Sequence, residues 1–223
     1  NEYFEVYPEP VKNFLKNFRK RHNADEVIGL LKSLKEMRVL LIGETILDEY
    51  HYVAAIGKPP KGDHIAAKLI GEEVHAGGIL ACANHIANFC GSVDLITTIG
   101  KRDFKKEFVL ANLKSNINPH LFFHPTASTI VKRRYVNQNF LNKLFEIYII
   151  DDRPSPELEA NLLTHLSGIF SKRESYDLIL VLDYGHGLMT PALIDPICGQ
   201  DCFLAVNAQT NTANSGYNPI TKY

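Results

Sequence analysis

The sequence predicts an α/β protein built on a doubly wound, mostly parallel sheet. Three observations indicate this class: short apolar runs that end near Gly or Asp, helix-like segments between the runs, and two mixed segments that break the alternation. Strands that alternate with helices are typical of a parallel sheet covered on both faces. With 223 residues, of which 45% are hydrophobic, the chain is long enough to form a sizeable core.

Buried strands are predicted where an apolar run is bounded by turn residues. These runs are Val39–Gly43, Val93–Ile99, Leu178–Leu182 and Phe203–Asn207. Helices are predicted where apolar residues recur at helical spacing behind a suitable first residue. They cover Ile79–Phe89, Phe104–Lys114, Pro156–Phe170 and Thr190–Cys198.

The segment before the first strand, residues 8–37, is typical of two helices. The second helix begins after Asn23, which is a good N-cap. Its apolar residues fall on one stripe, which we expect to pack against the next part of the chain. The stripe consists of Val27, Leu30, Leu31, Leu34 and Met37.

Two segments, Tyr50–Val74 and Thr129–Ile150, mix polar and apolar residues with partial alternation. Alternation favours antiparallel strands with one exposed face, outside the main sheet. We therefore expect lid strands within residues 50–75 and 129–150, forming a small β-sheet that covers a site.

Composition and charge exclude several classes of partner. The net charge of -1 argues against nucleic acid and against an anionic membrane, and the basic clusters at Lys16–Arg21 and Lys132–Arg134 are expected to be solvated faces. No apolar run approaches the ~20 residues of a membrane span, and no signal peptide is recognisable. The four cysteines have no zinc-ligand spacing. We expect a cytoplasmic protein.

The candidate site lies where ligands bind in open parallel sheets, beyond the carboxyl ends of the strands. Asp48 follows the first strand, and a carboxylate there can accept hydrogen bonds from two sugar hydroxyls; the alternative is that it caps the following turn. Gly77 and Gly78 precede a helix, where glycine lets the backbone approach a ligand. The alternative for this pair is a plain turn.

Four further side chains are candidates for contact with an anion or a substrate. Asp183 ends the third strand, and His186 in the following loop can contact phosphate or exchange a proton; a loop histidine can also do neither. Lys132 and Arg134 share one face of a strand, because side chains alternate. They suit a phosphate, or else form a charged outer face.

The order of these motifs resembles the ribokinase-like (PfkB) carbohydrate kinases over roughly residues 38–210. Within them the sequence is most similar to heptose-7-phosphate kinase, the kinase half of the bifunctional kinase and nucleotidyltransferase. The resemblance implies a doubly wound α/β domain with a β-sheet lid, its C-terminal part missing, and a homodimer formed through the lid. It also implies ATP and Mg²⁺ for the intact parent, with neither assignable within this chain.

The resemblance carries the family's substrate ligands onto this sequence. Its strand-end Asp falls on Asp48, its glycine pair on Gly77 and Gly78, the Lys and Arg of its lid strand on Lys132 and Arg134, and its Asp-Tyr-Gly segment begins at Asp183. Ala81 stands where heptose kinases carry Asn, and Asn84, one helical turn later, is the expected substitute. His186 replaces a family Lys, and Asn207 lies in Val206–Asn211, where the family has Asp-Pro-Lys. The sugar is therefore left open.

One family motif, Gly-Ala-Gly-Asp, does not occur in the sequence. Its Asp is the family's general base, so the base is expected beyond Tyr223, and we expect no kinase activity from the chain alone. Residues 1–37 are interpreted as a helical connector from an upstream domain, which in related fusion proteins is a nucleotidyltransferase. Residues 38–223 are the N-terminal, sugar-binding part of the kinase domain.

Three hypotheses remain, and the first is favoured. The chain is the substrate-binding portion of an ATP-dependent sugar or sugar-phosphate kinase; or it is a non-catalytic, kinase-like sugar-binding or regulatory module; or it is a nucleotide-binding Rossmann protein. The third is weakest, because no Gly-x-Gly-x-x-Gly comes after the first strand.

Overall fold

The body of the molecule is a parallel sheet with the strand order β4-β3-β1-β7-β8. The computed structural model describes residues 7–103, 105–151, 153, 155–172, 176–210 and 218–223. The strands of the body are β1 (Arg38–Gly57), β3 (Ser92–Gly100), β4 (Ile117–His124), β7 (Leu178–Asp183) and β8 (Phe203–Ala208). The helices are α3 (Ile79–Ile86), α4 (Lys106–Ala111), α5 (Pro156–Phe170) and α6 (Pro191–Cys198).

Alternate residues of β1 belong to two separate cores, one on each face of the sheet. Val39 and Leu41 lie in the core that contains residues of α3 and α4. Leu40 and Ile42 lie in the core that contains residues of α5 and α6. A strand whose side chains are buried on both faces has to be apolar throughout, as this run is. The predicted doubly wound, mostly parallel sheet is confirmed.

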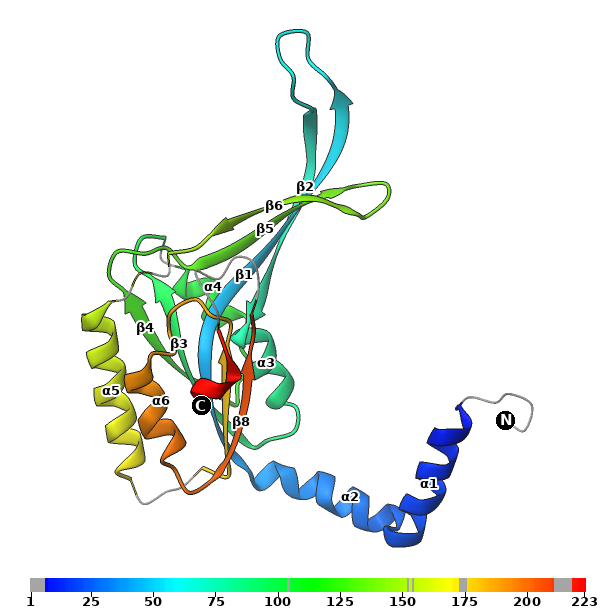
Figure 1. Ribbon diagram of the computed structural model, residues 1–223, viewed down its shortest axis with the longest axis vertical. Coiled ribbons are helices and arrows are strands. Elements are labelled where there is room, and N and C mark those ends of the chain that lie inside the picture. Colours follow the sequence, from blue (N-terminus) through cyan, green and yellow to red (C-terminus); the bar gives the residue numbers. More distant parts are fainter. Residues whose placement is uncertain (1–6, 104, 152, 154, 173–175, 211–217) are drawn as a thin grey trace.

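The lid consists of β2 (Ala66–Gly78), β5 (Ile130–Asn137) and β6 (Lys143–Ile149), together with the second half of β1. Its strand order is β2-β1-β5-β6, with antiparallel pairing except between β1 and β5. β1 pairs with β3 up to Glu44 and with β2 from Thr45 onward, so one long strand rises out of the body and becomes the centre of the lid (Figure 1). The first strand predicted at 39–43 is thus only the beginning of a 20-residue strand.

Two boundaries and one strand differ from the prediction. α3 ends at Ile86 rather than Phe89, and α4 covers Lys106–Ala111 within the predicted Phe104–Lys114, of which Phe104 lies outside the described residues. β4 was not expected, because Pro119 interrupts an otherwise strand-like run. β4 pairs with β3 and ends the sheet order, and proline is tolerated on such an edge strand.

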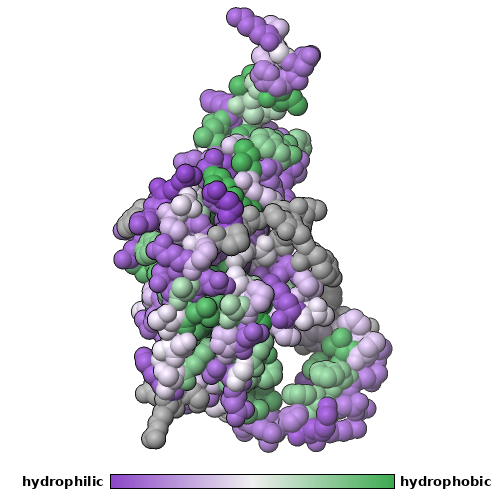
Figure 2. Space-filling view, turned by 60° about the vertical axis from the view of Figure 1, so that its left-hand side comes forward, coloured by the Kyte–Doolittle hydropathy of each residue, from purple (hydrophilic) through white to green (hydrophobic). Residues whose placement is uncertain are grey.

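An arm precedes the body and consists of α1 (Glu9–Arg21), α2 (Ala24–Ser33) and the short helix η1 (Leu34–Glu36). Asn23 caps α2 as predicted, since its Oδ1 accepts a hydrogen bond from the Glu26 N–H at 2.7 Å. The expected packing of the apolar stripe is wrong at Leu30 and Leu31, which are 62% and 56% exposed, whereas Met37, the last residue of the stripe, does pack against the core. The reason is that the arm projects away from the body (Figure 1), and its hydrophobic residues remain at the surface (Figure 2).

A further short helix, η2 (Ile220–Lys222), lies over the carboxyl end of β7 through contacts with Asp183. None of the helices in the described part of the chain combines the length and the apolar character needed to cross a bilayer.

Candidate functional site

Asp48 lies in the middle of β1, at the point where the strand leaves the body and enters the lid. It pairs with His75 of β2 on one side and with Lys132 of β5 on the other. It therefore neither ends a strand nor caps a turn, and the capping alternative is wrong. A residue at this position is held by strands on both sides, which is a rigid place for a side chain that has to meet a ligand.

The two glycines let the Asp48 carboxylate rest against the backbone. A Cβ atom on Gly77 would stand 2.0 Å from Asp48 Oδ2, a distance that no methyl group can occupy. Gly78 has a φ of 54°, in the left-handed region that favours glycine, and it directly precedes α3. Glycine is therefore needed at Gly77 to leave room for the Asp48 carboxylate, and at Gly78 because of its φ and because a Cβ atom there would stand 2.7 Å from Glu44 O.

Two rows of side chains form the polar face of the lid around Asp48. Residues paired directly across neighbouring strands project on the same face. The first row is His75, Asp48, Lys132 and Tyr148, and the second row is Glu73, Tyr50, Arg134 and Glu146. Lys132 and Arg134 share this face, as the alternation predicted.

Arg134 is the paired cation of the polar face. Its Nη1 donates to Asp48 Oδ1 at 2.5 Å, and its Nε lies 3.4 Å from Glu146 Oε1. The guanidinium carbon also lies 5.2 Å from the centre of the Tyr50 ring, within cation–π distance. Arg134 thereby fixes one oxygen of Asp48 and leaves the carboxylate with further lone pairs for a ligand.

Lys132 differs from Arg134 because the described residues offer its ammonium no ion pair. Its Nζ lies 5.6 Å from the centre of the Tyr148 ring. Burial lowers the pKa of Lys132, although Asp48 opposes that shift. A half-buried cation without a carboxylate partner is a suitable contact for an anionic group of a ligand.

The remaining predicted residues lie outside this face. Asp183 is buried beneath the C-terminal residues, where its carboxylate accepts hydrogen bonds from Asn218 Nδ2 at 3.1 Å and from the Tyr223 hydroxyl at 2.7 Å, and pairs with Lys222. Asn84 ties α3 to the chain after α4, since its amide bonds Asn112 O and the Lys114 N–H. The structure does not bring either side chain to Asp48.

His186 and Asn207 also stand apart from the Asp48 face. The side chain of His186 is buried in the loop after β7, and its backbone N–H donates to Glu44. Asn207 is exposed on β8. Both residues lie near the carboxyl edge of the sheet, where they were predicted, but on other elements than the lid.

Sequence reasoning missed Glu44, which directly follows Gly43. The residue is 1% exposed, and its two carboxylate oxygens accept hydrogen bonds from the Tyr184 N–H at 2.8 Å and from the His186 N–H at 3.2 Å. Burial raises its pKa to about 7, and the charge of Asp183 adds to the rise. The available signal was a carboxylate within an otherwise apolar strand.

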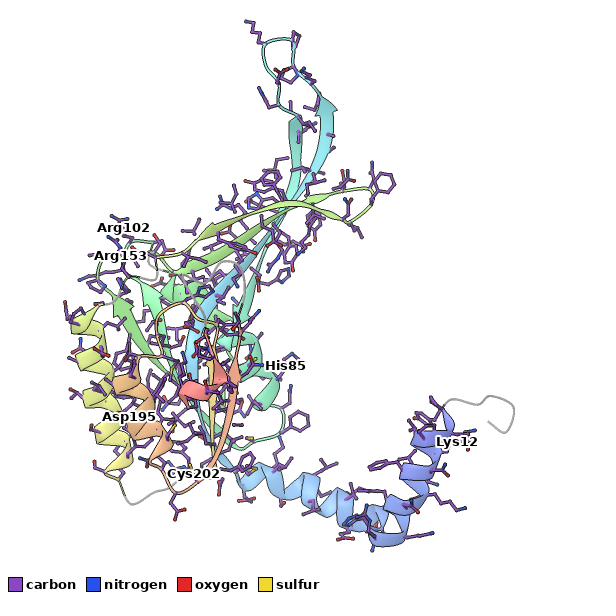
Figure 3. The ribbon with its side chains drawn as sticks, in the orientation of Figure 1. Lys12, His85, Arg102, Arg153, Asp195 and Cys202 are labelled. Atoms are coloured by element: carbon purple, nitrogen blue, oxygen red, sulfur yellow. The ribbon has the colours of Figure 1, made fainter. Side chains whose placement is uncertain are left out.

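A cavity of about 90 Å³ lies at the carboxyl edge of the sheet between β1, β3, α5 and α6, with Glu44, Thr129 and His186 in its lining. Arg153, also in the lining, stands at this edge above α5 (Figure 3). Asp48 and Lys132 are not among the lining residues, so the polar face of the lid is not part of this cavity. The described residues contain no group of three or more potential metal ligands.

Comparison with known proteins yields sequence relatives, although no protein-family model matches. The bifunctional protein HldE of Hydrogenovibrio crunogenus is 25% identical over 182 residues, which cover 74% of this chain and 36% of that protein. HldE of Rhodopseudomonas palustris is 27% identical over 168 residues, covering 74% and 34%. HldE of Geotalea uraniireducens is 24% identical over 197 residues, covering 86% and 39%. The chain therefore spans less than two fifths of the length of these curated relatives.

Comparison with solved structures finds a carbohydrate kinase from Agrobacterium tumefaciens, with a TM-score of 0.49 at 16% identity, covering 76% of this chain and 53% of that one. A ribokinase from Cryptococcus neoformans in complex with ADP has a TM-score of 0.48 at 18% identity, covering 77% and 48%. The sequence relatives agree with the predicted resemblance: this chain is similar to the bifunctional protein HldE over 74–86% of its own length.

Proposed function

We propose that this chain is the substrate-binding portion of an ATP-dependent sugar or sugar-phosphate kinase, which transfers a phosphoryl group to a sugar hydroxyl. The observation that carries the proposal is the Asp48 carboxylate, which lies against Gly77 and shares one lid face with Lys132 and Arg134. The sequence relatives named bifunctional protein HldE support the same class.

Asp48 suits a polyol because its carboxylate is only partly used. Arg134 occupies one lone pair of Oδ1, and an ionised carboxylate has about four acceptor sites. Two neighbouring sugar hydroxyls donating to these sites make charge-assisted hydrogen bonds, which are stronger than neutral ones. The rings of Tyr50 and Tyr148 on the same face supply flat apolar surface for the sugar ring.

A sugar phosphate is the preferred substrate, because Lys132 lies next to Asp48 on the polar face without an ion pair among the described residues. A phosphate on the sugar would compensate this half-buried charge. A heptose phosphate is one such substrate. The departures at Ala81, His186 and Asn207 from the heptose kinase pattern keep the identity of the sugar a matter for experiment.

The other parts of the reaction are assigned to the intact parent. ATP and Mg²⁺ would bind there, the base that deprotonates the sugar hydroxyl would lie beyond Tyr223, and a nucleotidyltransferase domain would precede the helical arm. The role of this chain is to bind and orient the sugar. A non-catalytic sugar-binding or regulatory module is the alternative. Turnover of ATP by the pure chain would contradict the proposal that the base and the ATP site lie outside this chain.

A homodimer through the lid is part of the proposal. The face of the lid opposite Asp48 carries exposed apolar side chains on β2 and β6, among them Val74, Phe145 and Ile147. An exposed apolar patch of this kind is typical of a protein interface. Hydrophobic residues gathered on the lid are visible in Figure 2.

The direct test is to change Asp48→Asn and to measure the binding of D-manno-heptose 7-phosphate, ribose 5-phosphate and the unphosphorylated sugars by calorimetry. We expect the affinity for the best ligand to fall at least about tenfold, because a charge-assisted hydrogen bond becomes a neutral one. Asp195→Asn, on α6 and far from the lid (Figure 3), is the matched control and should bind as the wild type does. Unchanged binding by Asp48→Asn would refute the assignment.

A further inference from the structure

Glu44 is a buried carboxylate that the proposed binding of sugar does not use. It lies four residues before Asp48 on the same strand and is almost completely buried. Placing a carboxylate in such an environment is costly even when it is hydrogen-bonded. Perturbed buried carboxylates at the carboxyl edge of a parallel sheet are candidates for a functional role.

The loop after β7 is built around the Glu44 carboxylate. Gly185 has a φ of 74° and Gly187 a φ of 91°, and these left-handed glycines alternate with residues whose N–H groups turn toward Glu44. Main-chain turns with converging N–H groups form sites for anions. Here the anion is a side chain of the protein itself, so the shape of the loop depends on Glu44.

Tyr184 connects this loop to α3, the helix that follows the glycine pair at Asp48. Its backbone N–H donates to Glu44, whereas its ring packs against the core beneath α3, with the hydroxyl 4.0 Å from Cys82 Sγ. Burial raises the pKa of Tyr184, and the charge of Asp48 contributes to the rise. Cys82 lies in the first turn of α3, so the phenol is packed at the start of the helix that directly follows the glycine pair beside Asp48.

We infer that Glu44 is a positioning residue, which holds the loop at 184–188 so that the Tyr184 ring stays packed at the first turn of α3 and keeps the glycine pair in place against Asp48. The inference rests on the proposed function. A carboxylate is needed because it accepts from both N–H groups at once. In a glutamine, one of the two terminal atoms would be a donor facing a donor.

The first measurement tests, in the 223-residue chain, whether Glu44 fixes the loop at 184–188. In ¹⁵N-labelled wild type we expect the amide signals of Tyr184 and His186 to move together between pH 5 and pH 9 as Glu44 titrates. In Glu44→Gln we expect that shared movement to be lost. Glu49→Gln is the matched control, since Glu49 is a second buried carboxylate of β1 that pairs with Arg133 on the other face of the lid; it should keep the wild-type pattern.

Other titratable groups face Glu44, so the comparison between variants carries the conclusion and the wild-type profile alone does not. They lie on β4, β5, α5 and β7, in the loops after β6 and β7 and in the C-terminal residues, and they are His124, Lys132, Asp151, Arg153, Glu159, Asp183, Tyr184, His186 and Tyr223. All of them remain in Glu44→Gln. A shared titration of the Tyr184 and His186 amides that persists in this variant would overturn the inference.

The second measurement is the affinity for D-manno-heptose 7-phosphate. Glu44→Gln should weaken it about tenfold at pH 8, since a misplaced binding group loses most of its contribution. The affinity of Glu44→Asp, which keeps the charge, should lie between the affinities of the wild type and of Glu44→Gln. The affinity of Glu49→Gln should match that of the wild type. Melting temperatures identify any variant that does not fold, and Glu44→Asp then takes the place of Glu44→Gln.

The outcomes separate the inference from the proposed function. If Asp48→Asn loses affinity while Glu44→Gln and Glu44→Asp bind as the wild type does, the positioning role is overturned and the proposed function stands. If the wild type binds no sugar or sugar phosphate, the proposed function fails and the positioning role fails with it. Weaker binding by Glu44→Gln with loss of the amide titration supports both.

Discussion

Along β1, residues 39–42 lie in the body and are 0–3% exposed, whereas Ile56, near the lid end of the same strand, is 71% exposed. In the body, apolar side chains fill two cores, one on each face of the sheet. In the lid, many apolar side chains are at the surface, and the contacts between strands include ion pairs and stacked rings, such as Tyr135 and Phe145, whose ring centres are 4.5 Å apart.

The difference indicates that the body half of β1 contributes mainly to stability and the lid half mainly to recognition. Burial of apolar surface is the main stabilising contribution in a fold of this kind, and it is concentrated in the body. The lid presents polar and aromatic groups on one face and apolar groups on the other, which suits contact with a ligand and with another protein surface. Glu44 and Asp48 lie where the two parts of the strand meet.

The largest expected effect is a loss of stability in the body. Leu41→Ala should lower the free energy of unfolding by about 4 kcal/mol, because Leu41 is completely buried and its removal leaves a cavity. Ile56→Ala in the lid should change it by no more than about 0.5 kcal/mol. Urea unfolding followed by circular dichroism measures both. Equal effects would mean that the lid is buried in solution, and the distinction drawn along β1 would then be wrong.

The second effect concerns pH and Glu44. Because burial raises the pKa of Glu44 from 4.5 to about 7, the folded chain holds a proton that the unfolded chain has released between these values. The stabilisation is complete below pH 4.5 and is lost as the pH rises through 7. A shift of this size corresponds to about 3 kcal/mol.

The test of this linkage is urea unfolding of the wild type and of Glu44→Gln at pH 5 and pH 8. The wild type should lose more stability than the variant between these conditions, because glutamine has no proton to release. An equal loss of stability in the two proteins would show that the Glu44 carboxylate is solvated, or stabilised by other groups, in the folded state. Glu44 would then not differ in this respect from the carboxylates of the lid.

The body could be predicted from sequence because its signal is local. Val39–Ile42 and Leu178–Leu182 are apolar throughout, as strands buried on both faces must be. β4 escaped prediction because Pro119 is a strand breaker in most positions and is tolerated here only by its place at the edge of the sheet. The stripe at Leu30 and Leu31 predicted a packed helix, and periodicity cannot show whether a partner surface exists.

The candidate site could be predicted in part. Asp48, Gly77, Lys132 and Arg134 come together because β1, β2 and β5 are neighbours in the lid, and the order of motifs indicated this. The role of Glu44 could not be predicted, since its burial depends on a loop 140 residues away in the sequence. Asp183 was predicted from the rule that ligands bind beyond the carboxyl ends of parallel strands, but the C-terminal residues cover its carboxylate.

The smallest effect tests whether the ion pairs of the lid contribute to its stability. Arg133 Nε donates to Glu49 Oε2 at 2.6 Å, and the Arg133 side chain is 31% exposed. A double-mutant cycle with Arg133→Ala and Glu49→Gln should give a coupling energy of no more than about 1 kcal/mol. Because the pair is partly solvated, this coupling should shrink in 1 M NaCl, where screening extends over only ~3 Å. A coupling of several kcal/mol that resists salt would mean that the lid is stabilised by a buried ion pair, and stability would then be shared between the two halves of β1.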